Sequence, residues 1–245
     1  MAALKNRIAF LFLTLVFTTN FAPMSAQQSS DDRARLIYVY DAFCGWCYGF
    51  SGVMKQVYED YQDQMDFQVV SGGMMLGDRE GPVGEVAPFI KGAYTTVETH
   101  TGVTFGEAYL EKLMAGTHYM NSMPPALAMT VFRDHLPDQT VPFAHALQRM
   151  FYYDGVDGND TLSYGRLAAT FGLDEAEFVS KMAAPATLER TREDFQLSNQ
   201  LGVNGFPTVF LMHHGQLHLL ARGYTDPTTF TSRIDSVLAT VPGGE

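Results

Sequence analysis

Two cysteines in the stretch Cys44-Gly45-Trp46-Cys47 are the feature that most constrains this chain. They are the only cysteines among its 245 residues. Residues 36–40 before them are apolar at every position, which suits a buried strand, and a helical pattern follows them. The amide groups and the dipole at the start of a helix stabilise a thiolate, and a second thiol nearby can attack the mixed disulfide that the first one forms. The pattern therefore predicts thiol–disulfide exchange, with Cys44 as the attacking thiolate and Cys47 as the deeper, resolving thiol.

Two other interpretations of the pair are half of a zinc site and a structural disulfide. A zinc site needs about four ligands, but the chain has no second cysteine pair, and of its seven histidines only His213 and His214 are adjacent. A disulfide that closes so short a loop removes little entropy from the unfolded chain. The acidic loop at residues 154–160 lacks the register and the terminal glutamate of a calcium loop. The sequence therefore predicts a redox pair and no metal site.

Residues 1–26 have the pattern of a secretory signal peptide. Lys5 and Arg7 precede a short apolar run, which is well below the roughly 20 residues that span a bilayer. We expect cleavage after Ala26, with Ala22 as the alternative position and an uncleaved membrane anchor as the alternative role. No later segment is long and apolar enough to cross a membrane. The sequence thus predicts export to the periplasm, an oxidising space in which a disulfide persists, without stable membrane insertion.

The mature chain, from Gln27 onward, carries a strong negative charge. The signal peptide contains two of the 16 basic residues, so 14 basic residues remain against 27 acidic ones, a net charge near −13. Such a chain is repelled by the phosphates of nucleic acids and by anionic membrane surfaces, so we expect neither as a partner.

Periodicity predicts a helical block between two mixed segments. The first segment has strands at residues 36–40 and 67–70 with a helix between them. The block shows no convincing strand, and its expected helices lie around residues 86–94, 105–116, 124–135, 141–153, 161–171 and 174–183. The last segment has a helix at 185–201, strands at 208–213 and 216–221, and a helix from Pro227.

The order β-α-β, helical block, α-β-β-α is the thioredoxin topology with an insertion. We therefore predict an α/β protein with a thioredoxin-like fold, interrupted by an all-helical insertion of about 100 residues. The expected divisions are residues 27–84 for the first half with the cysteine pair, 85–184 for the insertion, and 185–245 for the second half.

Three pieces of sequence resemble one known family. They are Asp41-Ala42-Phe43-Cys44-Gly45-Trp46-Cys47-Tyr48-Gly49-Phe50, Phe171-Gly172-Leu173-Asp174 and Gly202-Val203-Asn204-Gly205-Phe206-Pro207-Thr208. The chain resembles the DsbA family of thiol–disulfide oxidoreductases, most closely its FrnE-like branch of predicted protein-disulfide isomerases. It is also similar to 2-hydroxychromene-2-carboxylate isomerases, which lack the cysteine pair, so the pair here favours redox chemistry.

The resemblance implies an active-site loop at Phe206, Pro207 and Thr208. In the family this Pro peptide bond is cis and faces the cysteine pair, and the backbone before it pairs with an extended substrate peptide. The sequence alone also allows an ordinary proline at the start of an edge strand, where no N–H is required.

Three residues around the pair are expected to modulate its chemistry. Gly45 and Trp46 lie between the thiols and include no histidine, so we expect a lower reduction potential than that of the family's strong oxidants. Asp41 could relay protons to Cys47 or could end the strand and cap the turn, and the turn preference of aspartate favours the cap.

The predicted function is a protein disulfide oxidoreductase, an oxidase or an isomerase, that acts on cysteine-containing exported proteins. A redox partner would recycle the pair, and no bound cofactor is needed because the pair is itself the redox group. Two alternatives stay open: a periplasmic thiol protein that binds copper(I), since thiolates are soft ligands, and a glutathione-dependent isomerase of the 2-hydroxychromene-2-carboxylate type.

Overall fold

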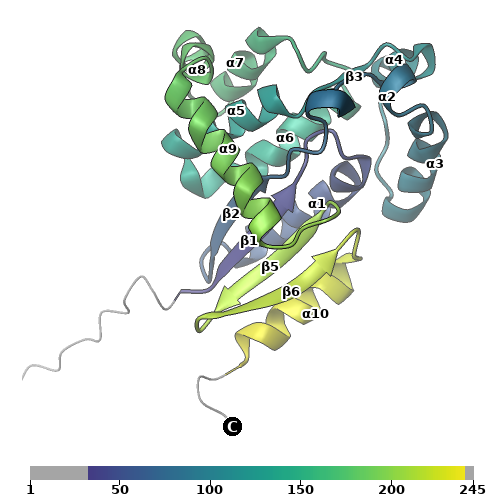
Figure 1. The fold of residues 1–245 in the computed structure, drawn as a ribbon. Helices are drawn as coiled ribbons and strands as arrows, with labels where there is room; N and C mark the ends of the chain where they lie inside the picture. Colours follow the sequence, from purple (N-terminus) through teal and green to yellow (C-terminus); the bar gives the residue numbers. More distant parts are fainter. Residues whose placement is uncertain (1–32, 241–245) are drawn as a thin grey trace, which may run out of the picture. The chain divides into compact units, whose positions relative to one another are not determined.

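A mixed four-stranded sheet organises the part of the chain that the computed structural model describes, residues 33–240; the predicted signal peptide lies outside it. The strand order is β2-β1-β5-β6 (Figure 1). The strands are β1 (Arg35–Tyr40), β2 (Asp66–Ser71), β5 (Thr208–His213) and β6 (Gln216–Arg222). β1 pairs with β2 in parallel and with β5 antiparallel, so segments far apart in the sequence meet at the centre of the sheet.

Strand β1 is buried on both faces, as its unbroken apolar pattern predicts. Tyr38 points into the larger of two hydrophobic clusters, to which α1 (Gly45–Tyr61) and α10 (Pro227–Leu238) contribute. Val39 points to the other face, into a smaller cluster against which α9 (Pro185–Gln200) packs. Figure 1 shows α9 and α10 on opposite sides of the sheet. The predicted β-α-β … α-β-β-α order is confirmed.

The helical insertion lies between β2 and α9. Its helices are α2 (Val83–Val86), α3 (Ile90–Thr101), α4 (Glu107–Ala115), α5 (Met123–His135), α6 (Thr140–Tyr152), α7 (Thr161–Ala169) and α8 (Glu175–Met182). Aromatic rings fill its interior: those of Phe132 and Phe143 stack with centroids 3.9 Å apart, and Phe171 meets both edge-on. The Asp174 carboxylate accepts a hydrogen bond from the Glu177 N–H at 2.8 Å and so caps the start of α8.

The insertion is not entirely helical, which corrects the sequence analysis. A two-residue strand, β4 (Tyr119–Met120), pairs with β3 (Gly81–Pro82) in a second small sheet. Two residues are too few to show the alternation by which strands are recognised in a sequence.

The helix expected around residues 86–94 is also displaced. Pro88 disfavours the helical conformation for the residue before it, and Ala87 adopts φ −150° and ψ 59°. The chain therefore breaks at this point into α2 and α3. Among residues 33–240, no helix has the length and apolar character needed to span a membrane.

Candidate active site

The cysteine pair lies where the chain leaves β1 and enters α1. The Asp41 carboxylate accepts a hydrogen bond from the Phe43 N–H at 2.9 Å, and the Asp41 carbonyl accepts one from the Cys44 N–H at 3.1 Å. This turn makes Cys44 the N-cap residue of α1, and its carbonyl accepts the first helical hydrogen bond, from Tyr48 at 3.1 Å. Cys44 therefore occupies the position at which helix amides and the helix dipole favour a thiolate.

The two thiols differ in burial. Cys44 is 7% exposed and Cys47 is fully buried behind it. Burial raises the pKa of Cys47 well above its ordinary value, and the hydrogen bond and charge of Cys44 raise it further. Cys47 is therefore a protonated thiol at neutral pH, whereas Cys44 is the sulfur that an incoming disulfide can reach.

The loop before β5 faces Cys44, although the two lie more than 150 residues apart. The Cys44 thiol donates a hydrogen bond to the Phe206 carbonyl, with Sγ and O 3.4 Å apart. The Phe206–Pro207 peptide bond is cis, as the resemblance implied. Thr208 is buried, and its hydroxyl donates to the Gly205 carbonyl at 2.8 Å. The fold thus brings both ends of the predicted site together.

The Phe206 ring lies against Gly72, the residue that follows β2. A Cβ atom at Gly72 would stand 2.0 Å from Cε1 and 2.3 Å from Cζ of that ring. Only glycine lets the loop approach the end of β2 this closely.

Replacement of Gly72 with alanine should therefore displace the Phe206 ring and, with it, the carbonyl that faces Cys44. We expect a severalfold slower reaction with a disulfide substrate and a free energy of unfolding lower by about 1–3 kcal/mol, the usual cost of overpacking. The matched control is Gly52→Ala on the exposed face of α1, where an added Cβ meets no atom within 4 Å. That variant should react like the wild type; equal rates for both variants would contradict the prediction.

Asp41 is buried and ties the active-site turn to the insertion. Its Oδ1 accepts a hydrogen bond from the Ser122 hydroxyl at 2.9 Å, and its Oδ2 accepts one from the Met74 N–H at 2.7 Å. Burial raises the pKa of Asp41, and the hydrogen bonds from Met74, Phe43 and Ser122 oppose this rise. Asp41 in turn has two opposite effects on the pKa of Cys47: a hydrogen bond from its backbone lowers this pKa, and its charge raises it. These contacts are those of a turn cap that also interacts with Cys47.

Gln148 on α6 contacts the first turn of α1 from the insertion and is fully buried. With its amide oriented to satisfy its neighbours, it donates to the Cys47 carbonyl at 3.2 Å and accepts from the Tyr48 N–H at 3.0 Å. Sequence reasoning missed both Gln148 and Ser122. The available signal for Gln148 was a polar residue on the apolar face of a predicted helix.

A cavity of about 370 Å³ opens beside Cys44. Its walls come from the first turn of α1, the loop after β2 and the beginning of the insertion, including α3, and aromatic and aliphatic side chains dominate them. Within the described part of the chain, Arg79 is the one charged side chain in the lining. Met74, Met75 and Met120 also line it.

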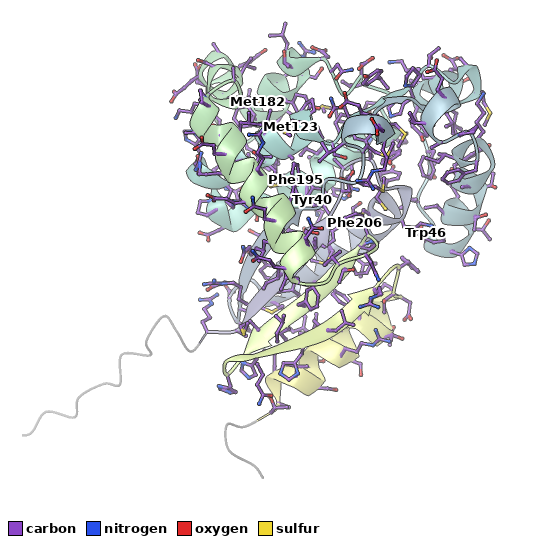
Figure 2. All side chains as sticks on the ribbon, in the orientation of Figure 1. Tyr40, Trp46, Met123, Met182, Phe195 and Phe206 are labelled. Carbon is purple, nitrogen blue, oxygen red and sulfur yellow. The ribbon has the colours of Figure 1, made fainter. Side chains whose placement is uncertain are left out.

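Trp46 forms part of the cavity wall between the two cysteines. Its ring meets that of His100 on α3 edge-on, with centroids 5.9 Å apart. Figure 2 labels Trp46, which comes from α1, and Phe206, which comes from the loop before β5. Residues 33–240 contain no group of three or more His, Cys, Asp or Glu side chains arranged to hold a metal ion.

Comparison with known proteins agrees with this geometry. The family model for the DSBA-like thioredoxin domain matches residues 35–235. A candidate protein disulfide isomerase from Nitrosomonas europaea is similar in structure, with a TM-score of 0.74 and 22% identity over 84% of this chain and 98% of that one. The cytosolic disulfide reductase DsbM from Pseudomonas aeruginosa has a TM-score of 0.69 and 26% identity over 83% and 98%.

A 2-hydroxychromene-2-carboxylate isomerase is also similar in fold, with a TM-score of 0.60 and 11% identity over 83% of this chain and 96% of that one. No curated protein matches the sequence. Since the family model covers most of the chain, the chain belongs to the DSBA-like thioredoxin family of disulfide oxidoreductases and isomerases.

Proposed function

We propose that this protein is an exported thiol–disulfide oxidoreductase that acts on cysteine-containing proteins through Cys44 and Cys47. One observation carries the proposal: the Cys44 thiol lies between the Phe206 carbonyl, 3.4 Å away, and an apolar cavity, with Cys47 fully buried behind it. A nucleophile with one accessible side and a protected resolving thiol is the arrangement that dithiol exchange requires.

Exchange proceeds in two steps. In the reducing direction, the Cys44 thiolate attacks a substrate disulfide; a Cys44–substrate disulfide forms, and the other substrate sulfur leaves and takes up a proton. Cys47 then loses its proton and attacks Cys44 Sγ, which forms the Cys44–Cys47 disulfide and releases the second substrate sulfur. Two electrons pass from the pair to the substrate. Oxidation of a substrate is the reverse sequence, and a redox partner restores the pair in either case.

The cavity beside Cys44 suits a large apolar side chain next to the substrate cysteine. Phe89 at its mouth is 76% exposed, so a charge there would not disturb the core. We expect Phe89→Asp to raise the KM for a disulfide peptide with a neighbouring aromatic residue severalfold, because an apolar contact is replaced by a carboxylate.

The same variant should react normally with a small, uncharged aliphatic disulfide such as 2-hydroxyethyl disulfide, which has no aromatic group for the cavity. Leu162→Asp is the matched control, since Leu162 is 55% exposed and lies outside the cavity lining. An unchanged KM in Phe89→Asp, or an equal rise in the control, would contradict a role for the cavity in substrate binding.

The proposed reaction is either the oxidation of substrate thiols or the isomerisation of substrate disulfides, and its proposed location is the periplasm. The pattern of residues 1–26 supports export, whereas the related DsbM is described as cytosolic. Acid quenching of cells followed by alkylation of free thiols tests both points when it is combined with fractionation. A periplasmic protein with an oxidised pair indicates an oxidase, a periplasmic protein with a reduced pair indicates an isomerase or a reductase, and a cytosolic protein contradicts export.

The proposed activity itself is tested with the purified protein. It should accelerate either the reduction of insulin by dithiothreitol or the refolding of a reduced protein that contains several disulfides. Loss of both activities, together with copper retained stoichiometrically through gel filtration, would favour a copper(I)-binding thiol protein instead.

A second candidate function is a glutathione-dependent isomerase, favoured by the aromatic cavity and by the fold similarity to a 2-hydroxychromene-2-carboxylate isomerase. This activity would survive the loss of Cys44, whereas dithiol exchange would not.

A further inference from the structure

The hydroxyl of Tyr38 differs from most buried polar groups of the described chain. Tyr38 is 1% exposed, and its hydroxyl has no hydrogen-bond partner other than the side chain of Cys47. A buried donor without a well-formed hydrogen bond destabilises a folded protein, so each such group calls for an explanation. Tyr38 stands in the middle of β1, the central strand, between Val69 of β2 and Val209 of β5.

The side chain of Tyr38 lies under the first turns of α1. Its ring centroid is 6.3 Å from that of Phe50, which follows Cys47 by three residues on the same helix. Burial raises the pKa of Tyr38 well above its ordinary value. Among its ionisable neighbours the charge of Cys47 raises this pKa most, and a hydrogen bond with the Cys47 side chain adds to the rise. The phenol therefore keeps its proton at neutral pH and can only donate a hydrogen bond to an anion.

Cys47 is the anion in question, because it becomes a thiolate only during exchange. Its titratable neighbours come from the helices and strand packed around it and from the turn between β1 and α1. They are Cys44 at the N-cap of α1, Asp41 after β1, Tyr38 and Tyr40 on β1, and Tyr152 on α6. The hydrogen bond and the charge of Cys44 oppose ionisation of Cys47; the Asp41 backbone favours it through a hydrogen bond, and the Asp41 charge opposes it. Of the neighbouring side chains, Tyr38 is the one whose buried proton has no other acceptor.

We propose that the Tyr38 hydroxyl is a further catalytic group, which donates a hydrogen bond to the Cys47 thiolate when Cys47 resolves the mixed disulfide. This inference rests on the proposed exchange activity. Cys47 releases its proton to solvent or to the leaving substrate thiolate and attacks Cys44 Sγ, and the Cys44–substrate bond breaks. Tyr38 is not consumed, and in the reverse direction it stabilises Cys47 as the leaving thiolate.

Ellman's reagent separates the two steps in a single stopped-flow experiment on the reduced protein. Attack by Cys44 releases one coloured thiolate and leaves a mixed disulfide, and resolution by Cys47 releases a second. Tyr38→Phe should slow the second phase by about threefold to tenfold at neutral pH. A rise of one unit in the pKa of Cys47 lowers the population of its thiolate tenfold. The more basic thiolate is also a better nucleophile, which recovers part of the lost rate.

The pH dependence distinguishes this role from a structural one. In Tyr38→Phe the pH midpoint of the second phase should rise by about one unit, the equivalent of a tenfold change in thiolate population, while the first phase stays within twofold. Tyr40→Phe is the matched control, because Tyr40 is equally buried, lies two residues further along β1 and loses the same single oxygen atom. It should leave both phases unchanged.

An unchanged midpoint in Tyr38→Phe would overturn the proposal, as would an equal change in both phases or the same shift in Tyr40→Phe. Failure of the exchange activity itself has a separate signature, since the wild type would then release no coloured thiolate. Thermal unfolding verifies that the variant is folded, which we expect because the lost hydroxyl has no hydrogen-bond partner other than the Cys47 side chain.

Discussion

Replacement of Cys44 with serine should reduce thiol–disulfide exchange to the background rate of the uncatalysed reaction. A serine hydroxyl is not ionised at the start of a helix at neutral pH and cannot form a disulfide, so the first step is lost outright. Cys47 cannot take over, because it is fully buried and its pKa is raised. Insulin reduction and the release of colour from Ellman's reagent should both fall to the level without protein.

Cys47→Ser is the matched variant, because it removes the other sulfur and keeps the accessible one. Cys44 should still attack, but the mixed disulfide has no internal nucleophile to resolve it. Covalent complexes with substrate proteins should therefore accumulate and disappear on reduction, as seen by electrophoresis under non-reducing and reducing conditions. The double variant should form none.

The pair of variants also discriminates between the candidate functions. Turnover that survives in Cys44→Ser and depends on glutathione would show that Cys44 is not the reactive group and would support the isomerase. If Cys44→Ser rather than Cys47→Ser trapped covalent complexes, Cys47 would be the attacking thiol and Cys44 the resolving thiol, the reverse of the assignment made from burial.

Much of this site could be predicted because its parts are encoded by short local patterns. A turn that contains Asp41, the cysteine pair and an amphipathic helix appear in order along the sequence, and the Pro207 loop precedes a clear strand. The topology then brings these two segments together, since β1 and β5 are neighbours in the sheet.

The parts that could not be predicted depend on contacts between distant segments. Ser122 comes from the loop after a two-residue strand and meets Asp41 only in the folded chain, across 81 residues. The close packing of the Phe206 ring against Gly72 likewise could not be predicted. In the sequence Gly72 is only the first of two glycines after a strand. In the sequence Tyr38 resembles any other apolar residue of a central strand; only the structure shows that its buried hydroxyl has no hydrogen-bond partner other than the Cys47 side chain.

Asp41→Ala should destabilise the protein strongly. Three donors lose their acceptor: the N–H groups of Phe43 and Met74 and the hydroxyl of Ser122. Each buried donor left unpaired costs about 1–3 kcal/mol, and removal of a buried charge offsets part of that cost, so we expect the free energy of unfolding to fall by about 3 kcal/mol. Urea denaturation, followed by circular dichroism and by the fluorescence of Trp46, the only tryptophan, measures the change.

Asp41→Asn separates the hydrogen bonds from the charge. The amide oxygen can still accept from Phe43 and Ser122, but the amide nitrogen faces the Met74 N–H, so one hydrogen bond is lost and the expected fall is about 1 kcal/mol. If both variants lost the same free energy, the charge rather than the hydrogen bonds would explain the effect of Asp41.

The pH dependence of this difference has a defined sign. Burial raises the pKa of Asp41 above its ordinary value of 3.8, so over the interval between these two pKa values the folded state binds more protons than the unfolded state. The cost of the buried charge is then fully present above the raised pKa and is relieved as the pH falls toward 3.8. The stability of the wild type relative to Asp41→Asn should therefore increase on acidification. A decrease would mean that the hydrogen bonds to Asp41 outweigh its burial.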